Sequence, residues 1–271
     1  MQDPPAAHGG ADSSTKTELS DLQKRINDLI KPKGHPIAFK MFHDETDLDE
    51  RMISHLVRTP LALCQVMKLV NIYGIPKLMV KENRQGCSMG EHSLGFSRIP
   101  NELCAAWRLI FGMEPQDFEK IAKDILSVPL GEYAAVFFAP LRSFDEFSAE
   151  PDGVIFNVNG TQALLLLWAT YIGTMEKPVW SYNGNASCEI VAALKLGKSP
   201  WFVMPCLGAR SLASTQDDEL WFGLSLKHLR LAERSLARFS MSYPPAVEQA
   251  LFVPPLSEHM ITKLIQAKEF K

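Results

Sequence analysis

Apolar residues along this chain change several times from helical spacing to continuous, strand-like runs. Within residues 20–30, Leu22, Ile26 and Leu29 recur at helical spacing and predict a short amphipathic helix. Continuous apolar runs predict strands at residues 36–42, 77–81 and 133–139. Between these strands the pattern predicts helices at residues 61–73, 102–111 and 115–126.

The order of the predicted elements is repeated after Pro151. Residues 151–156 predict a strand, residues 161–173 a helix, and residues 178–182 a strand that leads into a turn at residues 183–185. Further strands are predicted at residues 201–203 and 219–226, and C-terminal helices at residues 229–239 and 259–270. Three pairs of landmarks lie about 100 residues apart, namely Gln65 with Gln162, Gly74 with Gly173, and Cys87 with Cys188. We interpret this offset as an internal duplication.

These elements predict an α/β (or α+β) fold. Two duplicated βαβ-like halves, at about residues 36–140 and 151–226, would pack around a central site. Neighbouring strands would be parallel and connected by right-handed crossovers. We expect residues 18–271 to form a single globular domain with a C-terminal helical segment, after a polar, disordered leader at residues 1–17.

Composition narrows the class of protein. A chain of 271 residues with 46% hydrophobic residues can bury a large core. The formal net charge is −3 and the Lys and Arg residues form no run, which argues against nucleic-acid binding. The longest apolar stretch, residues 163–169, is too short to span a bilayer. We therefore expect a cytoplasmic protein without a membrane partner, which acts on a small molecule or exchanges electrons with another protein; a homo-oligomer remains open.

The cysteines carry the clearest chemical signal. Cys206 lies between Pro205 and Gly208, at the end of the apolar run at residues 201–203. Cys87 and Cys188 precede predicted helices, and Cys64 lies in the first turn of another. The duplication would bring these four cysteines together from both halves. By contrast, Cys104 lies on an apolar helix face, where a cysteine typically fills the core.

Four thiolates from separate segments predict a metal site. Five cysteines are an odd number, and a chain of this size needs no disulfide framework. Both zinc and iron–sulfur clusters select thiolate ligands. No pair of cysteines has the CxxC spacing of zinc ribbons, so the spacing by itself is a weak signal and leaves structural cysteines open.

Three further residues are candidates for chemistry beside the cysteines. Arg210 could bind a carboxylate or phosphate bidentately, or form a structural ion pair with a nearby acidic residue, Asp217, Asp218 or Glu219. Glu91 and His92 follow Cys87 closely and could supply acid–base chemistry. An adjacent Glu-His pair is more often part of an ordinary helix surface.

Several short motifs, in order from about residue 36 to about residue 219, resemble an uncharacterised prokaryotic family, domain of unknown function 169, also called the ArCR group. The motifs are Pro36-Ile37-Ala38-Phe39-Lys40, Leu63-Cys64-Gln65, Cys87-Ser88-Met89-Gly90, Leu94-Gly95, Pro140-Leu141, Pro151-Asp152, Gln162-Ala163, Cys188, Cys206-Leu207-Gly208-Ala209-Arg210 and Asp218-Glu219-Leu220. The resemblance implies that Cys64, Cys87, Cys188 and Cys206 are family positions, whereas Cys104 is not. It implies no settled activity, but it favours a shared site for a 4Fe-4S cluster over zinc.

Three functions therefore follow from the sequence. The first is a protein with a cysteine-ligated 4Fe-4S cluster, used for electron transfer or for Lewis-acid catalysis on a small molecule. The second is a metal-free protein that binds a small molecule and has structural cysteines. The third is a thiol enzyme, with Cys87 or Cys206 as nucleophile and His92 as base.

Overall fold

A seven-stranded sheet forms the centre of the protein, with strand order β2-β3-β1-β4-β7-β6-β5. The computed structural model describes residues 18–238 except residues 84, 148, 178 and 181–185. The strands are β1 (Ile37–Phe42), β2 (Lys77–Val80), β3 (Ala135–Pro140), β4 (Gly153–Val158), β5 (Val179–Trp180), β6 (Trp201–Val203) and β7 (Leu220–Leu224). The leader at residues 1–17, the turn at residues 183–185 and the helix at residues 259–270 that the sequence predicts lie outside the described residues.

The mixed α/β class is confirmed, but the predicted parallel pairing is wrong. The central strands β1 and β4 are antiparallel, with Ala38 opposite Val154. The pairs β1–β3, β2–β3, β4–β7 and β6–β7 are also antiparallel, and among the paired strands only β5 and β6 run parallel. Long apolar strands suggest a parallel sheet because they are buried on both faces. Here helices bury both faces of a sheet that is mainly antiparallel.

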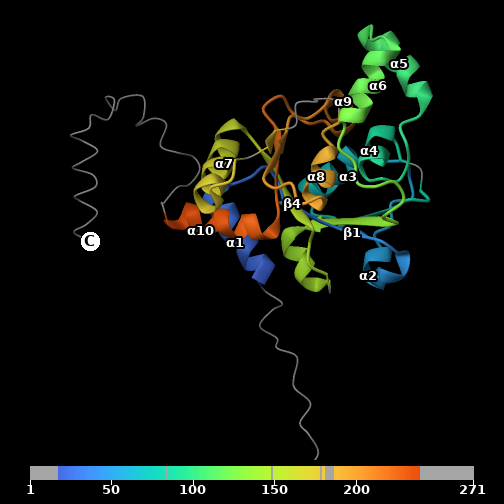
Figure 1. Cartoon of the computed structure of the whole chain (residues 1–271). Helices are drawn as coiled ribbons and strands as arrows, with labels where there is room; N and C mark the ends of the chain where they lie inside the picture. The colour runs from blue at the N-terminus through green and yellow to red at the C-terminus, as the bar shows by residue number, and fades with distance from the viewer. Residues whose placement is uncertain (1–17, 84, 148, 178, 181–185, 239–271) are drawn as a thin grey trace, which may run out of the picture.

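Helices cover the two faces of the sheet with two separate apolar cores. On β1, the side chains of Phe39 and Met41 enter one core, whereas Ala38 enters the other, as the alternation of a strand requires. The first face carries α3 (Leu63–Tyr73), α8 (Glu189–Lys195) and α9 (Leu207–Ala213). The second face carries α1 (Glu18–Ile30), α7 (Gly160–Thr174) and α10 (Leu226–Arg238), which gather on the opposite side of the molecule in Figure 1.

The structure does not confirm the duplication. The strands of the two sequence halves do lie on different sides of the sheet, with β2, β3 and β1 of the first half on one side and β4 to β7 of the second half on the other. However, α3 and α7, which the repeat makes equivalent, cover opposite faces. Their matching glutamines have a local explanation: Gln65 and Gln162 each accept a hydrogen bond at 2.8 Å from the backbone N–H that begins their helix. A glutamine at this position is a common capping residue and needs no common ancestry.

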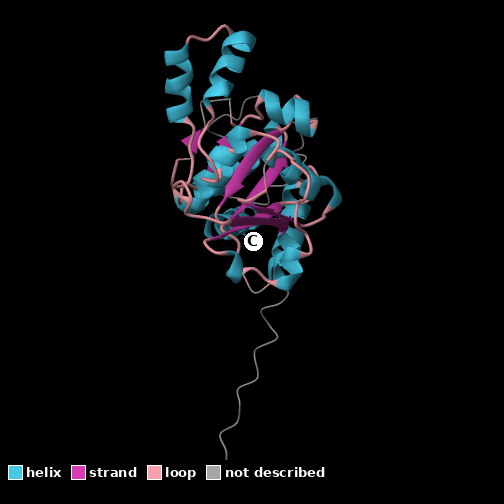
Figure 2. Ribbon diagram, turned by 90° about the vertical axis from the view of Figure 1, so that its right-hand side faces the viewer, coloured by secondary structure: helices cyan, strands magenta, loops and turns pink. Residues whose placement is uncertain are grey.

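A pair of helices projects from the first face. Helices α5 (Asn101–Phe111) and α6 (Pro115–Asp124) form a hairpin that turns at Gly112, whose φ of +64° places it in the left-handed region. Trp107 and Phe118 pack edge to face, with ring centroids 5.4 Å apart. Figure 2 shows the hairpin standing clear of the sheet. Its base covers the loops from which α4 (Ser88–Ser93) and α8 begin.

Two ion-pair groups connect the elements around this face. Lys68 of α3 and Glu219, beside β7, form a buried pair with 2.5 Å between Nζ and Oε2. Asp152, before β4, accepts from Lys40 of β1 at 3.2 Å and from Lys195 of α8 at 2.9 Å. None of the described helices is both long enough and apolar enough to cross a membrane.

Candidate cysteine site

Four cysteines stand at the beginnings of four helices on the same face of the sheet. Cys87 precedes α4, Cys188 precedes α8 and Cys206 precedes α9, each as the residue that caps the helix. Cys64 is in the first turn of α3. Cys64, Cys188 and Cys206 belong to one buried core, and half-buried Cys87 packs against it. The structure thus gathers two cysteines from each half, although the halves are not shown to be duplicates.

Two glycines allow the Cys87 turn to lie against the start of α3. The N–H of Gly86 donates to the carbonyl of Leu61 at 3.2 Å. A Cβ atom at Gly86 would lie only 2.6 Å from the carbonyl oxygen of Pro60, and one at Gly90 would lie 3.0 Å from Cβ of Leu63. Glycine therefore permits a backbone approach that a side chain would prevent. This approach places Cys87 beside the helix that carries Cys64.

Hydrogen bonds hold the thiol of Cys206. The backbone N–H of Ala209 donates to its Sγ at 3.4 Å, which caps α9. The hydroxyl of Ser187 donates to the same Sγ at 3.3 Å. Since Ser187 directly precedes Cys188, this second bond connects two of the cysteine-bearing loops. Both donors would stabilise negative charge on the sulfur.

The thiols interact electrostatically inside the protein. Burial raises the pKa of Cys64 to about 12, and charge on Cys206 and Cys87 adds to this effect. Burial also raises the pKa of Cys188 well above its ordinary value, and charge on Cys64, Cys206 and Cys87 raises it further. At neutral pH Cys64 and Cys188 are therefore protonated unless a positive charge binds between the thiols. A metal would supply that charge.

Two buried polar side chains flank the cysteines, and neither belongs to a recognisable motif in the sequence. Glu189 is 2% exposed, and its Oε2 accepts from the N–H of Leu126 at 3.3 Å, while Oε1 has no hydrogen-bond partner among the described residues. Burial raises the pKa of this carboxyl to about 7. Gln85 is 9% exposed, and within the part of the chain that the structure describes neither polar atom of its side-chain amide has a hydrogen-bond partner. The only signal in the sequence is their closeness to Cys188 and Cys87.

The other predicted site residues have partners of their own. Nη1 of Arg210 lies 2.8 Å from Oδ1 of Asp217, so the structure shows the ion pair that was the alternative interpretation of this arginine. Glu91 accepts from the N–H of Gln85 at 2.7 Å and from the hydroxyl of Ser97 at 2.9 Å, which fixes the loops on both sides of α4. Catalytic roles for Arg210 and Glu91 stay predictions.

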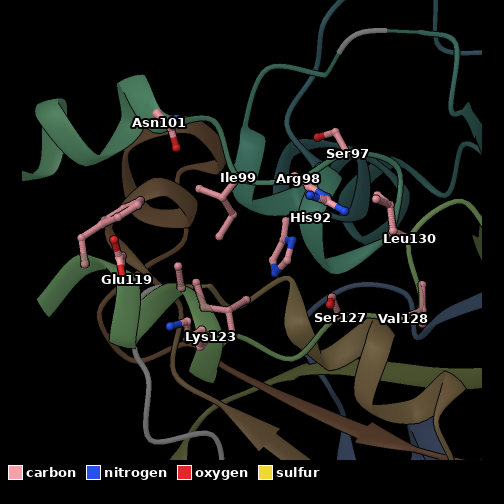
Figure 3. Close-up of a pocket in the computed structure, with 14 residues that line it drawn as sticks. His92, Ser97, Arg98, Ile99, Asn101, Glu119, Lys123, Ser127, Val128 and Leu130 are labelled. Carbon is pink, nitrogen blue, oxygen red and sulfur yellow. The ribbon is translucent and has the colours of Figure 1, made fainter. Parts of the chain in front are cut away.

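His92 lies in a cavity of about 650 Å³ between the end of α4 and the α5–α6 hairpin. Figure 3 shows its ring directed into this space. Burial lowers the pKa of His92, so its imidazole is neutral at pH 7. None of the four cysteines lines the cavity, and Cys87 packs against the core instead. A thiol enzyme with Cys87 or Cys206 as nucleophile and His92 as base stays a prediction.

The residues that the structure describes include no group of three or more His, Cys, Asp or Glu side chains arranged to hold a metal ion. The gathered cysteines nevertheless supply the donor type and the burial that a thiolate-ligated group requires. The 4Fe-4S cluster and its ligands stay a prediction.

Fold and site together define a mixed α/β protein in which both halves contribute cysteines to one face of a largely antiparallel sheet. Residues 25–234 match the family domain of unknown function 169, described as an uncharacterised ArCR. The chain belongs to this family, which confirms the resemblance seen in its motifs. No curated protein and no solved structure matches the chain.

Proposed function

We propose that this protein binds a 4Fe-4S cluster through Cys64, Cys87, Cys188 and Cys206. One observation carries the proposal: four separate chain segments bring cysteines to one face of the sheet, near enough that charge on Cys64, Cys87 and Cys206 would raise the pKa of the Cys188 thiol. A cysteine that only fills the core acts as a small apolar residue and gains nothing from the nearness of three other thiols. A group of thiols is stable as thiolates in the core only around a strong positive charge.

The surrounding residues support a protected cluster. Burial of Cys64, Cys188 and Cys206 excludes water, and the base of the α5–α6 hairpin covers the loops of Cys87 and Cys188. The N–H of Ala209 and the hydroxyl of Ser187 hold the Cys206 sulfur in one direction. Hydrogen bonds to thiolate sulfurs and burial are two of the features by which proteins set the potential of a cluster.

When bound, the cluster would supply one-electron transfer with four thiolate ligands, or an open iron for a small oxygenated or carboxylated substrate with three. Cys87 is half-buried whereas the other three cysteines are buried, so with three ligands Cys87 would be the cysteine that does not bind iron. We accordingly expect a redox protein or a small-molecule substrate as partner, in the cytoplasm. Zinc on the same thiolates is the alternative metal.

A second candidate function is a metal-free protein that binds a small molecule. The specific observation in its favour is the cavity lined by His92, which contains no cysteine among its described lining residues. A thiol enzyme with Cys87 or Cys206 as nucleophile has weaker support, since neither cysteine is among the described residues that line the cavity with His92.

Single Cys→Ser variants of the protein, purified without air, test the proposal. We expect each of Cys64→Ser, Cys87→Ser, Cys188→Ser and Cys206→Ser to reduce iron and acid-labile sulfide and to weaken visible absorption. Cys104→Ser is the matched control and should keep full iron content. Loss of iron in the Cys104 variant, or unchanged iron in all four others, would contradict the ligand assignment.

A further inference from the structure

The cavity beside the α5–α6 hairpin has an uneven distribution of charge. Two cationic side chains line it, Arg98 from the loop after α4 and Lys123 from α6. Neither has an ion-pair partner within the described part of the chain. Glu119 is the one carboxylate among the lining residues. Figure 3 shows it on the side of the cavity away from Arg98.

The rest of the lining is suited to an organic molecule. Phe118, Ile125 and Val128 give the cavity apolar walls, and the first two belong to the apolar cluster at the base of the hairpin. The hydroxyl of Ser127 and the amide of Asn101 add neutral polar groups. A volume of about 650 Å³ is within the usual range of small-molecule sites, roughly 300–1,000 Å³.

We propose that this cavity binds a small organic anion, a carboxylate or a phosphate monoester with an apolar body. Arg98 receives the anionic group, because a guanidinium can donate two parallel hydrogen bonds to two oxygens of a carboxylate or phosphate. Lys123 supplies a second positive charge from α6. The neutral imidazole of His92 can donate a hydrogen bond to the ligand or accept one from it. The apolar body lies against Phe118 and Ile125.

This assignment gives anion binding in the cavity to Arg98, because Arg210 is not among the described residues that line it. The guanidinium of Arg210 is occupied by Asp217 at 2.8 Å, whereas Arg98 faces a cavity. The inference does not depend on a cluster: the ligand site is lined by none of the cysteines. It is nevertheless next to them, because Phe118 and Ile125 pack with Met89 and Ala186, which are two residues from Cys87 and Cys188 respectively.

The test is calorimetric titration of the full chain, purified without air, with three probes of similar shape. Phenylacetate and phenyl phosphate carry the two anionic groups, and phenylacetamide is the neutral control. We expect at least one anion to bind with a dissociation constant of about 1 mM or tighter and phenylacetamide to bind at least about tenfold more weakly. The tighter of the two anions identifies the carboxylate or the phosphate ester as the natural group.

Arginine variants connect the binding to the cavity. Arg98→Ala should weaken the anion about 10- to 100-fold, the usual effect of losing charged hydrogen bonds, and Arg98→Lys should restore part of it. The matched control is Arg108→Ala, which removes a surface arginine of α5 that does not line the cavity. Iron content should be the same in all three variants, because none of them changes a cysteine. Loss of anion binding and loss of the cluster are therefore measured separately. Equal binding of phenylacetamide, absence of binding by both anions at about 10 mM, or an equal effect of Arg108→Ala would overturn the inference.

Discussion

Replacing Gly86 by alanine tests the geometry that places Cys87 beside Cys64. The added Cβ would lie 2.6 Å from the carbonyl oxygen of Pro60 and 3.0 Å from the backbone nitrogen of Ala62. Ordinary carbon contacts begin at about 3.5 Å, so the turn must move by roughly 1 Å. The obstructing atoms are backbone at the start of α3 and cannot rotate away. The hydrogen bond from Gly86 to Leu61 at 3.2 Å would lengthen with the movement.

We expect Gly86→Ala to lower the free energy of unfolding by about 1–3 kcal/mol, the usual cost of overpacking. Urea unfolding of the metal-free protein measures it, with Gly160→Ala as the control. A Cβ at Gly160, the first residue of α7, meets no atom within 4 Å, and the change should be neutral or stabilise by up to about 1 kcal/mol. Equal stability of both variants would refute the packing described for the Cys87 turn.

The same displacement has a consequence for the proposed cluster. Moving the turn by roughly 1 Å shifts Cys87 relative to α3, so the Gly86→Ala protein should retain less iron than the Gly160→Ala protein after purification without air. Loss of stability without loss of iron would show that the turn is packed as described but that Cys87 is not required as a ligand.

Three further predictions concern buried charges. Lys68→Met should lower the free energy of unfolding by up to about 3–5 kcal/mol, because the buried carboxylate of Glu219 then keeps only the more distant ammonium of Lys33, 4.0 Å away, and the double variant Lys68→Met/Glu219→Leu should recover much of this loss in urea unfolding. Because the pKa of Glu189 rises from 4.5 to about 7 on folding, the folded metal-free protein holds its proton more tightly. The free energy of unfolding should therefore fall by up to about 3 kcal/mol as the pH rises from about 4.5 to about 7, and the Glu189→Gln variant should show a smaller decrease. Asp152→Asn should lower the melting temperature because it removes the carboxylate charge that pairs with Lys195 at 2.9 Å, and an unchanged melting temperature would show that this pair contributes little.

The positions of most elements followed from the spacing of apolar residues, but their pairing did not. The run that forms β1 (Ile37–Phe42) was expected to have parallel neighbours, yet it is antiparallel to both β3 and β4. A strand buried on both faces has the same composition in either arrangement, since the direction of its neighbours depends on connections elsewhere in the chain. The duplication was inferred partly from Gln65 and Gln162, which share a capping role that any two helices can have.

The candidate site was predictable where its signal is local. Each of the four cysteines was placed at a turn or helix start from neighbouring Pro, Gly and apolar residues, and the structure gathers them. Glu189 and Gln85 were missed, because their burial depends on α6, α8 and the Cys87 loop meeting in three dimensions. The cavity with Arg98 was missed for the same reason: it forms between segments that are not adjacent in the sequence.

The proposed cluster is tested most directly by the content of iron, zinc and acid-labile sulfide in protein purified without air, together with its visible spectrum. A 4Fe-4S cluster predicts iron and sulfide in nearly equal amounts and a broad brown absorption that bleaches on reduction or exposure to air. Zinc alone, or a metal-free protein in which all five cysteines react as thiols, would contradict the cluster and leave the cysteine group a zinc-binding or structural part of the core.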